Sequence, residues 1–276
     1  MSTVTVRSFE IVRVETARAR RDQDRVAVEL PLEVRLNSQP FAVIMRTPGA
    51  DDALALGFLL TEGVIGGLDD IERIDLDEME SVINVWLAPG HDAALSHALG
   101  QRREVMMNSS CGMCGRRSLE ALKLDRPPFT DRWSVESRVL LGLPSTLAAA
   151  QPAFAETGGL HAAGLFDRAG HLVASEEDVG RHNAVDKLLG RMLRERRLPL
   201  DDLLLFVSGR TSFEIVQKAW VGGVRLVAGI SAPSSLAIDL ARTAGITLLG
   251  FVREDRCNAY AHDTRIATAP PNDGRD

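Results

Sequence analysis

Apolar and polar residues alternate along residues 26–46, interrupted only at Asn37 and Ser38. Alternation with a period of two is typical of half-buried strands, and a polar pair in its middle is typical of a turn. The segment is therefore predicted to form two strands joined by that turn. Pro31 favours an edge position, because proline has no N–H group to donate to a neighbouring strand.

A helix follows in the pattern. Thr47 and Pro48 form a helix start signal, residues 51–61 carry an apolar face, and Gly63 closes the segment. Strand patterns at residues 71–76 and 82–87 come next. The first part of the chain is therefore predicted to be a small α+β region.

The pattern changes in the second half. A helix is predicted around residues 135–149, before two short strands at 164–167 and 171–175. The clearest amphipathic helix follows, because apolar residues recur at helical spacing; they are Val185, Leu188, Leu189, Met192 and Leu193. One face of this helix is expected to lie in a core.

Near-continuous apolar runs then alternate with helical patterns. The runs are residues 203–207, 224–230 and 246–252, and the helical patterns are near 212–221 and 236–243. Such alternation predicts a largely parallel sheet covered on both faces. Paired prolines within the charged segment 125–131 mark the expected boundary, giving an N-terminal region of residues 1–130 and an α/β domain of residues 131–276.

Composition narrows the class of protein. The 276 residues include 32 basic and 38 acidic ones, for a formal net charge of -6, which argues against binding nucleic acid by phosphate neutralisation. No apolar run is long enough to span a bilayer, and no signal peptide is expected. Three cysteines in so long a chain indicate a reducing compartment, so the cytoplasm is the expected location.

Two of those cysteines, Cys111 and Cys114, are three positions apart. Gly112 and Gly115 remove side-chain bulk around them. Arg116 and Arg117 follow and supply positive charge, which favours the thiolate form of a cysteine. Because the thiolate is the nucleophile, this loop is suited to a cysteine that accepts and releases sulfur as a persulfide.

A single pair of cysteines at this spacing also occurs in metal sites and in dithiol redox sites. A structural zinc ion needs four ligands, and His91, His97 and Cys257 are isolated in the sequence, so no zinc is expected. A redox pair of the thioredoxin type would follow a strand and open a helix in a βαβ unit, a pattern that residues 102–108 do not provide.

Loops rich in glycine, serine and arginine follow the apolar runs. Ligands of open parallel sheets bind where the carboxyl ends of strands share an edge, and such loops offer N–H groups and positive charge to an anion. Each loop alone is also compatible with ordinary turns and caps. The candidate binding residues are Gly180, Arg181, His182, Ser208, Gly209 and Arg210, with a phosphate-bearing ligand expected.

The order of elements also resembles the cytidine-deaminase-like fold. Zinc deaminases require a histidine followed two residues later by glutamate, and then a pair of cysteines. Alanines follow His161, and Asn183 and Ala184 follow His182, while the segment 208–212 has no cysteine. Deaminase chemistry is therefore not expected.

Taken together, the motifs resemble those of the FdhD family, the formate dehydrogenase accessory sulfurtransferases. They occur in order over most of the chain: Thr47-Pro-Gly49, Ala55-Leu-Gly-Phe-Leu-Leu-Thr-Glu-Gly63, Ser110-Cys-Gly-Met-Cys-Gly115, Gly158-Gly-Leu-His-Ala-Ala163, Glu177-Asp-Val-Gly-Arg-His-Asn-Ala-Val-Asp-Lys-Leu188, Ser208-Gly-Arg-Thr-Ser-Phe-Glu214, Gln217-Lys218 and Ser231-Ala-Pro-Ser-Ser235. The resemblance implies a cytidine-deaminase-like, three-layer α/β/α C-terminal domain and a smaller α+β N-terminal domain.

The resemblance also implies a function. A cysteine desulfurase would load sulfur onto Cys111, with Cys114 as an auxiliary thiol. The sulfur would pass to the molybdenum (or tungsten) bis(molybdopterin guanine dinucleotide) cofactor, a bound substrate destined for formate dehydrogenase. A homodimer is the assembly that the family implies. A non-catalytic chaperone that only holds this cofactor is the alternative, and it would not need a transferable sulfur.

The family's cofactor-binding segment corresponds to residues after the last apolar run. They are Phe251, Val252, Arg253, Glu254, Asp255 and Arg256. Glu254 and Asp255 depart from the family's pattern, in which glycines are expected, and acidic residues disfavour a phosphate group close by.

Overall fold

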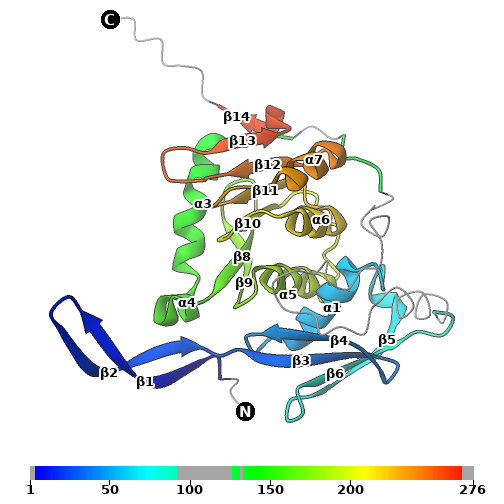
Figure 1. Ribbon diagram of the computed structural model, residues 1–276. Helices are drawn as coiled ribbons and strands as arrows, with labels where there is room; N and C mark the ends of the chain where they lie inside the picture. The colour runs from blue at the N-terminus through cyan, green and yellow to red at the C-terminus, as the bar shows by residue number, and fades with distance from the viewer. Residues whose placement is uncertain (1–3, 92–125, 131–132, 269–276) are drawn as a thin grey trace, which may run out of the picture.

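The computed structural model describes residues 4–91, 126–130 and 133–268, and it contains two main sheets with helices packed on them (Figure 1). Cys111 and Cys114 lie outside the described residues. The predicted boundary after residue 130 adjoins residues 131–132, which also lie outside the described residues. The division into residues 1–130 and 131–276 stays a prediction.

The smaller sheet has four strands in the order β4-β3-β6-β5. The predicted hairpin is confirmed as β3 (Leu30–Leu36) and β4 (Gln39–Arg46), and Asn37 and Ser38 form the turn with positive φ angles of 47° and 67°. The strands β5 (Ile71–Asp77) and β6 (Val82–Leu87) are confirmed as well.

The prediction that Pro31 lies in an edge strand is wrong. Strand β3 is internal, because β4 pairs with one side of it and β6 with the other. Proline is nevertheless accommodated, since β6 pairs only with the segment of β3 from Glu33 to Leu36. Pro31 therefore precedes the part of β3 that has two neighbours.

The larger sheet has six strands in the order β13-β12-β11-β10-β8-β9. Their bounds are β8 His161–Phe166, β9 Leu172–Asp178, β10 Leu204–Val207, β11 Leu226–Gly229, β12 Thr247–Gly250 and β13 Asn258–Ala261. Only the pairs β10 with β11 and β11 with β12 are parallel. The sheet is thus more mixed than predicted, because β8 pairs antiparallel with both β9 and β10, and β13 pairs antiparallel with β12.

Helices cover both faces of this sheet (Figure 1). One face packs against α3 (Ser137–Ala149) through Leu140, Leu143 and Leu147. The other face packs against α5 (Arg181–Arg194), α6 (Phe213–Gly222) and α7 (Ser235–Ala244). The three-layer α/β/α arrangement with a smaller α+β part is therefore confirmed. Neighbouring residues of β10, β11 and β12 alternate between the two cores.

The predicted helix α1 (Asp51–Thr61) joins the two parts of the molecule by packing against α5. Glycines bring their backbones together: a Cβ atom on Gly57 would lie 1.9 Å from the carbonyl oxygen of Asp186, and one on Gly190 would lie 1.8 Å from that of Ala53. Only glycine fits at either position, so the two helices touch backbone to backbone.

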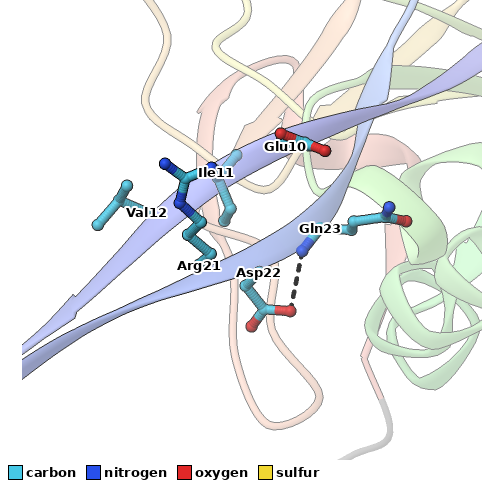
Figure 2. A pocket seen from close by; sticks show the side chains of 6 residues that line it. All are labelled: Glu10, Ile11, Val12, Arg21, Asp22 and Gln23. Carbon is cyan, nitrogen blue, oxygen red and sulfur yellow. Dashed lines mark hydrogen bonds between the residues drawn. The ribbon is translucent and has the colours of Figure 1, made fainter.

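A two-stranded arm precedes these elements, formed by β1 (Val6–Glu15) and β2 (Arg18–Ala27), which pair antiparallel (Figure 1). Its base lies against α4 (Pro152–Thr157), where Arg25 forms a 2.6 Å ion pair with Glu156. Figure 2 shows an open hollow on the arm, lined by Glu10, Ile11, Val12, Arg21, Asp22 and Gln23. Neither the arm nor α4 was predicted from the sequence.

Short elements complete the described chain. Strands β7 (Val135–Glu136) and β14 (Ile266–Ala267) pair in parallel, and single 3-10 turns form at η1 (Leu68–Asp70) and η4 (Asp263–Arg265). Among the described residues, no helix has both the length and the apolar character needed to cross a membrane.

Candidate functional site

The candidate site lies at one edge of the six-stranded sheet, where β9, β10, β11 and β12 end and β8 begins. The segment Ser208 to Arg210 follows β10 directly. The N–H of Ser208 donates to the carbonyl oxygen of Ala162 over 3.0 Å, and its hydroxyl accepts from the N–H of Ala162 over 2.9 Å. Ser208 therefore extends the pairing of β8 with β10, while Arg210 is exposed beyond it.

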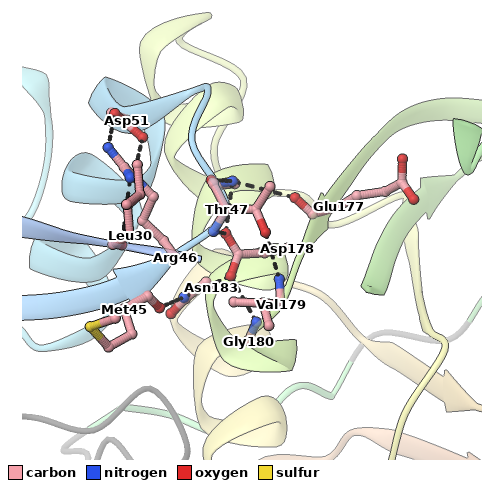
Figure 3. A network of polar contacts seen from close by, with 11 residues as sticks. Leu30, Met45, Arg46, Thr47, Asp51, Glu177, Asp178, Val179, Gly180 and Asn183 are labelled. Carbon is pink, nitrogen blue, oxygen red and sulfur yellow. Dashed lines mark hydrogen bonds and ion pairs between the residues drawn. The ribbon is translucent and has the colours of Figure 1, made fainter. Parts of the chain in front are cut away.

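Helix α5 begins at the same edge, and the buried carboxylate of Asp178 holds its start in place (Figure 3). One oxygen of Asp178 accepts from the N–H of Gly180 and from the side-chain amide of Asn183, each over 2.8 Å. The other accepts from the N–H of Thr47 over 3.1 Å and pairs with Lys187 at 2.8 Å. A fully buried charge needs such a set of donors to offset its lost hydration.

This network ties the N-terminal region to the site. Lys187 also donates to the carbonyl oxygen of Thr47 over 2.8 Å, and the Asn183 amide donates to that of Met45 over the same distance. The hydroxyl of Thr47 in turn accepts from the N–H of Val179 over 3.2 Å. The segment that links β4 to α1 therefore helps to fix where α5 begins.

The structure places Gly209, His161 and Arg181 side by side at this edge. A Cβ atom placed on Gly209 would lie 3.3 Å from Nδ1 of His161 and 3.7 Å from Cδ of Arg181. Gly209 is buried, whereas His161 and Arg181 are partly exposed. The absence of a side chain at residue 209 thus leaves the room that the imidazole and the arginine stem occupy.

The surroundings of His161 favour its neutral form. Burial lowers the pKa of His161 below its ordinary value of 6.5, and the positive charge of Arg181 lowers it further. His182 and Arg210 act in the same direction, whereas Asp178 opposes them. At neutral pH the ring is therefore an uncharged group between cations.

His182, at the second position of α5, is held from the other side by α6. Its Nε2 lies 2.7 Å from a carboxylate oxygen of Glu214 and 3.1 Å from the hydroxyl of Ser212. All three side chains are largely shielded from solvent. Its Nδ1 is buried and has no hydrogen-bond partner among the described residues. The starts of α5 and α6 are thereby fixed relative to each other.

The predicted cofactor segment lies two strands further along the edge, roughly 10 Å away at the usual spacing of strands. Phe251 is exposed with a φ of 51°, and Val252 lies in the core, so its side chain is not part of the surface. Arg253 donates to the carbonyl oxygen of Ile230 over 2.6 Å. Glu254, Asp255 and Arg256 are exposed, and Arg256 pairs with Asp255 at 3.3 Å.

The structure thus brings Gly180, Arg181 and His182 together with Ser208, Gly209 and Arg210, and it places the segment from Phe251 to Arg256 farther along the same edge. The predicted sulfur-bearing residues, Cys111 and Cys114, lie outside the described residues. The remaining cysteine, Cys257, is partly buried, and burial raises the pKa of its thiol, which disfavours the reactive thiolate.

Two residues of the site were not predicted as such, His161 and Asp178. Each lies at the terminus of a strand that extends beyond its sequence pattern: β8 begins at His161 and β9 ends at Asp178. The two residues pair. Both were present in the motifs that carried the family resemblance. Because Asp178 directly follows Glu176 and Glu177, its sequence neighbours gave no signal that this carboxylate is buried.

The described residues contain no group of three or more His, Cys, Asp or Glu side chains that could hold a metal ion. The expectation of a zinc-free protein concerns Cys111 and Cys114 as well, so it stays a prediction.

The fold and this edge define the class: a three-layer α/β protein in which arginines, histidines and glycine gather where the strands of the larger sheet end. The chain belongs to the FdhD/NarQ family, whose pattern it matches over residues 27–267. The family predicted from the sequence motifs is therefore confirmed.

Curated relatives are similar over nearly the whole chain. The sulfur carrier protein FdhD of Streptomyces avermitilis is 45% identical across 97% of each chain. The sulfur carrier protein FdhD of Saccharolobus solfataricus is 44% identical and covers 95% of this chain and 99% of its own. The crystal structure of a protein from Desulfotalea psychrophila, provisionally assigned as a formate dehydrogenase accessory protein, has the same fold, with a TM-score of 0.75 at 23% identity over 96% of this chain and all of that one.

Proposed function

We propose that this protein is a sulfur carrier that serves the maturation of formate dehydrogenase. A cysteine desulfurase would load sulfur onto Cys111, and the protein would transfer that sulfur to the molybdenum or tungsten bis-guanine-dinucleotide cofactor as its substrate. The observation that carries the proposal is the high identity, over nearly the full chain, to relatives named as sulfur carriers, together with the pair Cys111 and Cys114.

The loading step is an ordinary exchange at a sulfur atom. The Cys111 thiolate attacks the outer sulfur of the desulfurase persulfide, a new S–S bond forms at Cys111, and the old S–S bond breaks to release the desulfurase thiolate. No oxidant or reductant is consumed. Arg116 and Arg117 support this step, because nearby cations favour the thiolate form of a cysteine.

The cofactor would lie at the edge that begins with Gly180, Arg181 and His182. Support comes from the exposed Arg210, from the partly exposed Arg181 and from the start of α5, where the helix dipole favours an anion. The two guanine diphosphate moieties of the cofactor supply the negative charge that such an edge attracts. Action in the cytoplasm and assembly as a homodimer belong to the same proposal.

A maturation assay tests the proposal against the alternative of a non-catalytic cofactor chaperone. In cells lacking the native protein, Cys111→Ser is expected to abolish formate dehydrogenase activity, because no thiol remains to carry sulfur. Cys114→Ser is expected to cause a smaller loss, since a single carrier step needs one thiol. Cys257→Ser is the matched control and should behave as wild type, because Cys257 is partly buried with a raised thiol pKa.

Each outcome separates the candidates. Full activity of Cys111→Ser would contradict the sulfur-carrier proposal and favour the chaperone. Equal and complete loss in Cys111→Ser and Cys114→Ser would indicate an obligatory relay between the two thiols.

A further inference from the structure

The imidazole of His161 is partly exposed, and no hydrogen bond joins it to the described residues. His161 opens β8, and its ring lies beside Gly209, whose missing side chain leaves space for it. The stem of Arg181 borders the same space. A ring nitrogen in this position is available to a ligand that enters the edge.

The charges that face His161 come from every element around it. Arg181 and His182 belong to α5, Arg210 follows β10, and Asp178 ends β9. The carboxylate of Asp178 is already engaged by Lys187 and by backbone and amide donors. Burial and these charges together lower the pKa of the ring, which keeps it neutral until an anion arrives.

A neutral imidazole is a poor partner for phosphate. It carries one N–H donor and one acceptor nitrogen, and only the donor can bond to a phosphate oxygen. Protonation makes both nitrogens donors and adds a charge-assisted hydrogen bond. A phosphate beside Arg181 and Arg210 would offset the positive charge that opposes this protonation.

We propose that His161 is a phosphate-binding group of this edge and that its imidazole takes up a proton from solvent when a nucleoside diphosphate binds. The inference rests on the proposed function, which places a guanine dinucleotide here, and it adds a residue and a pH dependence to that function. Binding is tighter at lower pH, and the bound anion is released more readily as the pH rises.

The test uses guanosine diphosphate, the smallest probe that keeps the guanine and the diphosphate. Calorimetric titration of the full chain at pH 7 in two buffers of different ionisation enthalpy measures the protons taken up per ligand bound. Wild type and His171→Asn are expected to take up the same number, because His171 lies in the exposed turn at the opposite end of β8 and β9. Compared with wild type, His161→Asn should bind guanosine diphosphate several-fold more weakly, and its proton uptake should be smaller by at most one proton.

The pH dependence gives a second readout. Between pH 8 and pH 6, the affinity of wild type for guanosine diphosphate should increase more than that of His161→Asn. The ratio of the two increases should be up to about tenfold for each unit by which the ligand raises the pKa of the imidazole. The comparison between variants removes the titration of the phosphate itself, which is the same in both. Arg210→Ala should weaken binding while Arg168→Ala, in the turn beside His171, should not.

A spectroscopic measurement covers the case in which His161→Asn does not fold. The proton NMR resonance on Cε1 of His161 in wild type should titrate at a higher pH with guanosine diphosphate than without it.

The outcomes are distinguishable. If wild type binds guanosine diphosphate but proton uptake is unchanged by His161→Asn, or the resonance does not shift its titration, the inference about His161 is wrong and the proposed function stands. If wild type does not bind guanosine diphosphate at millimolar concentration, both the inference and the placement of the cofactor at this edge are wrong.

Discussion

Lys218 brings a positive charge into the contact between α6, α5 and α1. Its ammonium group donates to both carboxylate oxygens of Asp186, over 2.8 and 2.7 Å, and to the hydroxyl of Thr61 over 2.9 Å. Burial raises the pKa of Asp186, and the charge of Lys218 opposes that shift. Each charge of this buried pair therefore offsets the cost of burying the other, and removal of one partner leaves the other uncompensated.

Replacement of Lys218 alone should be costly. Lys218→Met leaves the Asp186 carboxylate buried without its counter-ion, and the free energy of unfolding should fall by about 3–5 kcal/mol in urea denaturation. Adding Asp186→Leu should restore most of that loss, because no buried charge then remains. Arg194→Ala is the matched control: it removes the exposed partner of Asp52 across the same helix pair and should cost less than about 1 kcal/mol. A loss that small in Lys218→Met would contradict the role given to this pair.

At the scale of elements, the contact of α1 with α5 depends on the two glycines at which the backbones meet. Gly190→Ala places a methyl group where the Ala53 carbonyl oxygen stands, and backbone atoms cannot yield as the end of a side chain can. The variant should lose about 3 kcal/mol or more of stability, at or above the usual range for overpacked cores.

Thermal and urea denaturation measure this effect against a matched helical glycine. Gly142 of α3 is exposed, and a Cβ atom there would meet nothing within 4 Å. Gly142→Ala should therefore gain up to about 1 kcal/mol from helix propensity. If Gly190→Ala were as stable as wild type, the close approach of α1 and α5 would not be a determinant of the fold.

The sequence allowed the elements with a buried face to be predicted. Helices α1 and α5 and the strands of both sheets except β13 followed from the apolar pattern, because burial imposes that pattern on the residues. The arm could not be predicted in this way, since Arg18, Arg20 and Arg21 are exposed and no face of β1 or β2 is buried along its length. The match to the family begins at residue 27, after most of the arm.

Prediction of the site followed the same logic. Loops at strand ends share an edge whatever their detailed sequence, so the meeting of Arg181 with Gly209 could be expected. The contact of His161 with Gly209 could not, because it depends on how far β8 extends and on its antiparallel pairing with β10. Strand direction and exact strand ends are set by tertiary pairing rather than by local pattern.

At the scale of the whole molecule, the site depends on both sheets. The backbone of Thr47 from the N-terminal region and the carboxylate of Asp178 from the larger sheet together hold the start of α5. The charges at the edge are therefore coupled to the stability of the entire fold, and pH should reveal that coupling.

The lowered pKa of His161 gives the sign of the effect. The native protein binds a proton at His161 less readily than the unfolded chain does, so protonation favours unfolding. This group's contribution to stability is present above its ordinary pKa of 6.5 and is lost as the pH falls below it toward the native value. In urea denaturation without ligand, His161→Asn should become more stable relative to wild type between pH 7.5 and pH 5, whereas His171→Asn should not follow that trend. A constant difference for His161→Asn would mean that the ring is not held neutral.

Sulfur on Cys111 is the central claim, and mass spectrometry tests it most directly. Purified protein is incubated with a cysteine desulfurase and cysteine, and its peptides are mapped without reduction. The peptide that contains Cys111 should gain the mass of one sulfur atom in wild type and in Cys114→Ser, and no peptide should gain it in Cys111→Ser. Absence of added sulfur on Cys111 in wild type, or equal labelling of Cys111→Ser, would contradict the assignment of this protein as a sulfur carrier that acts through Cys111.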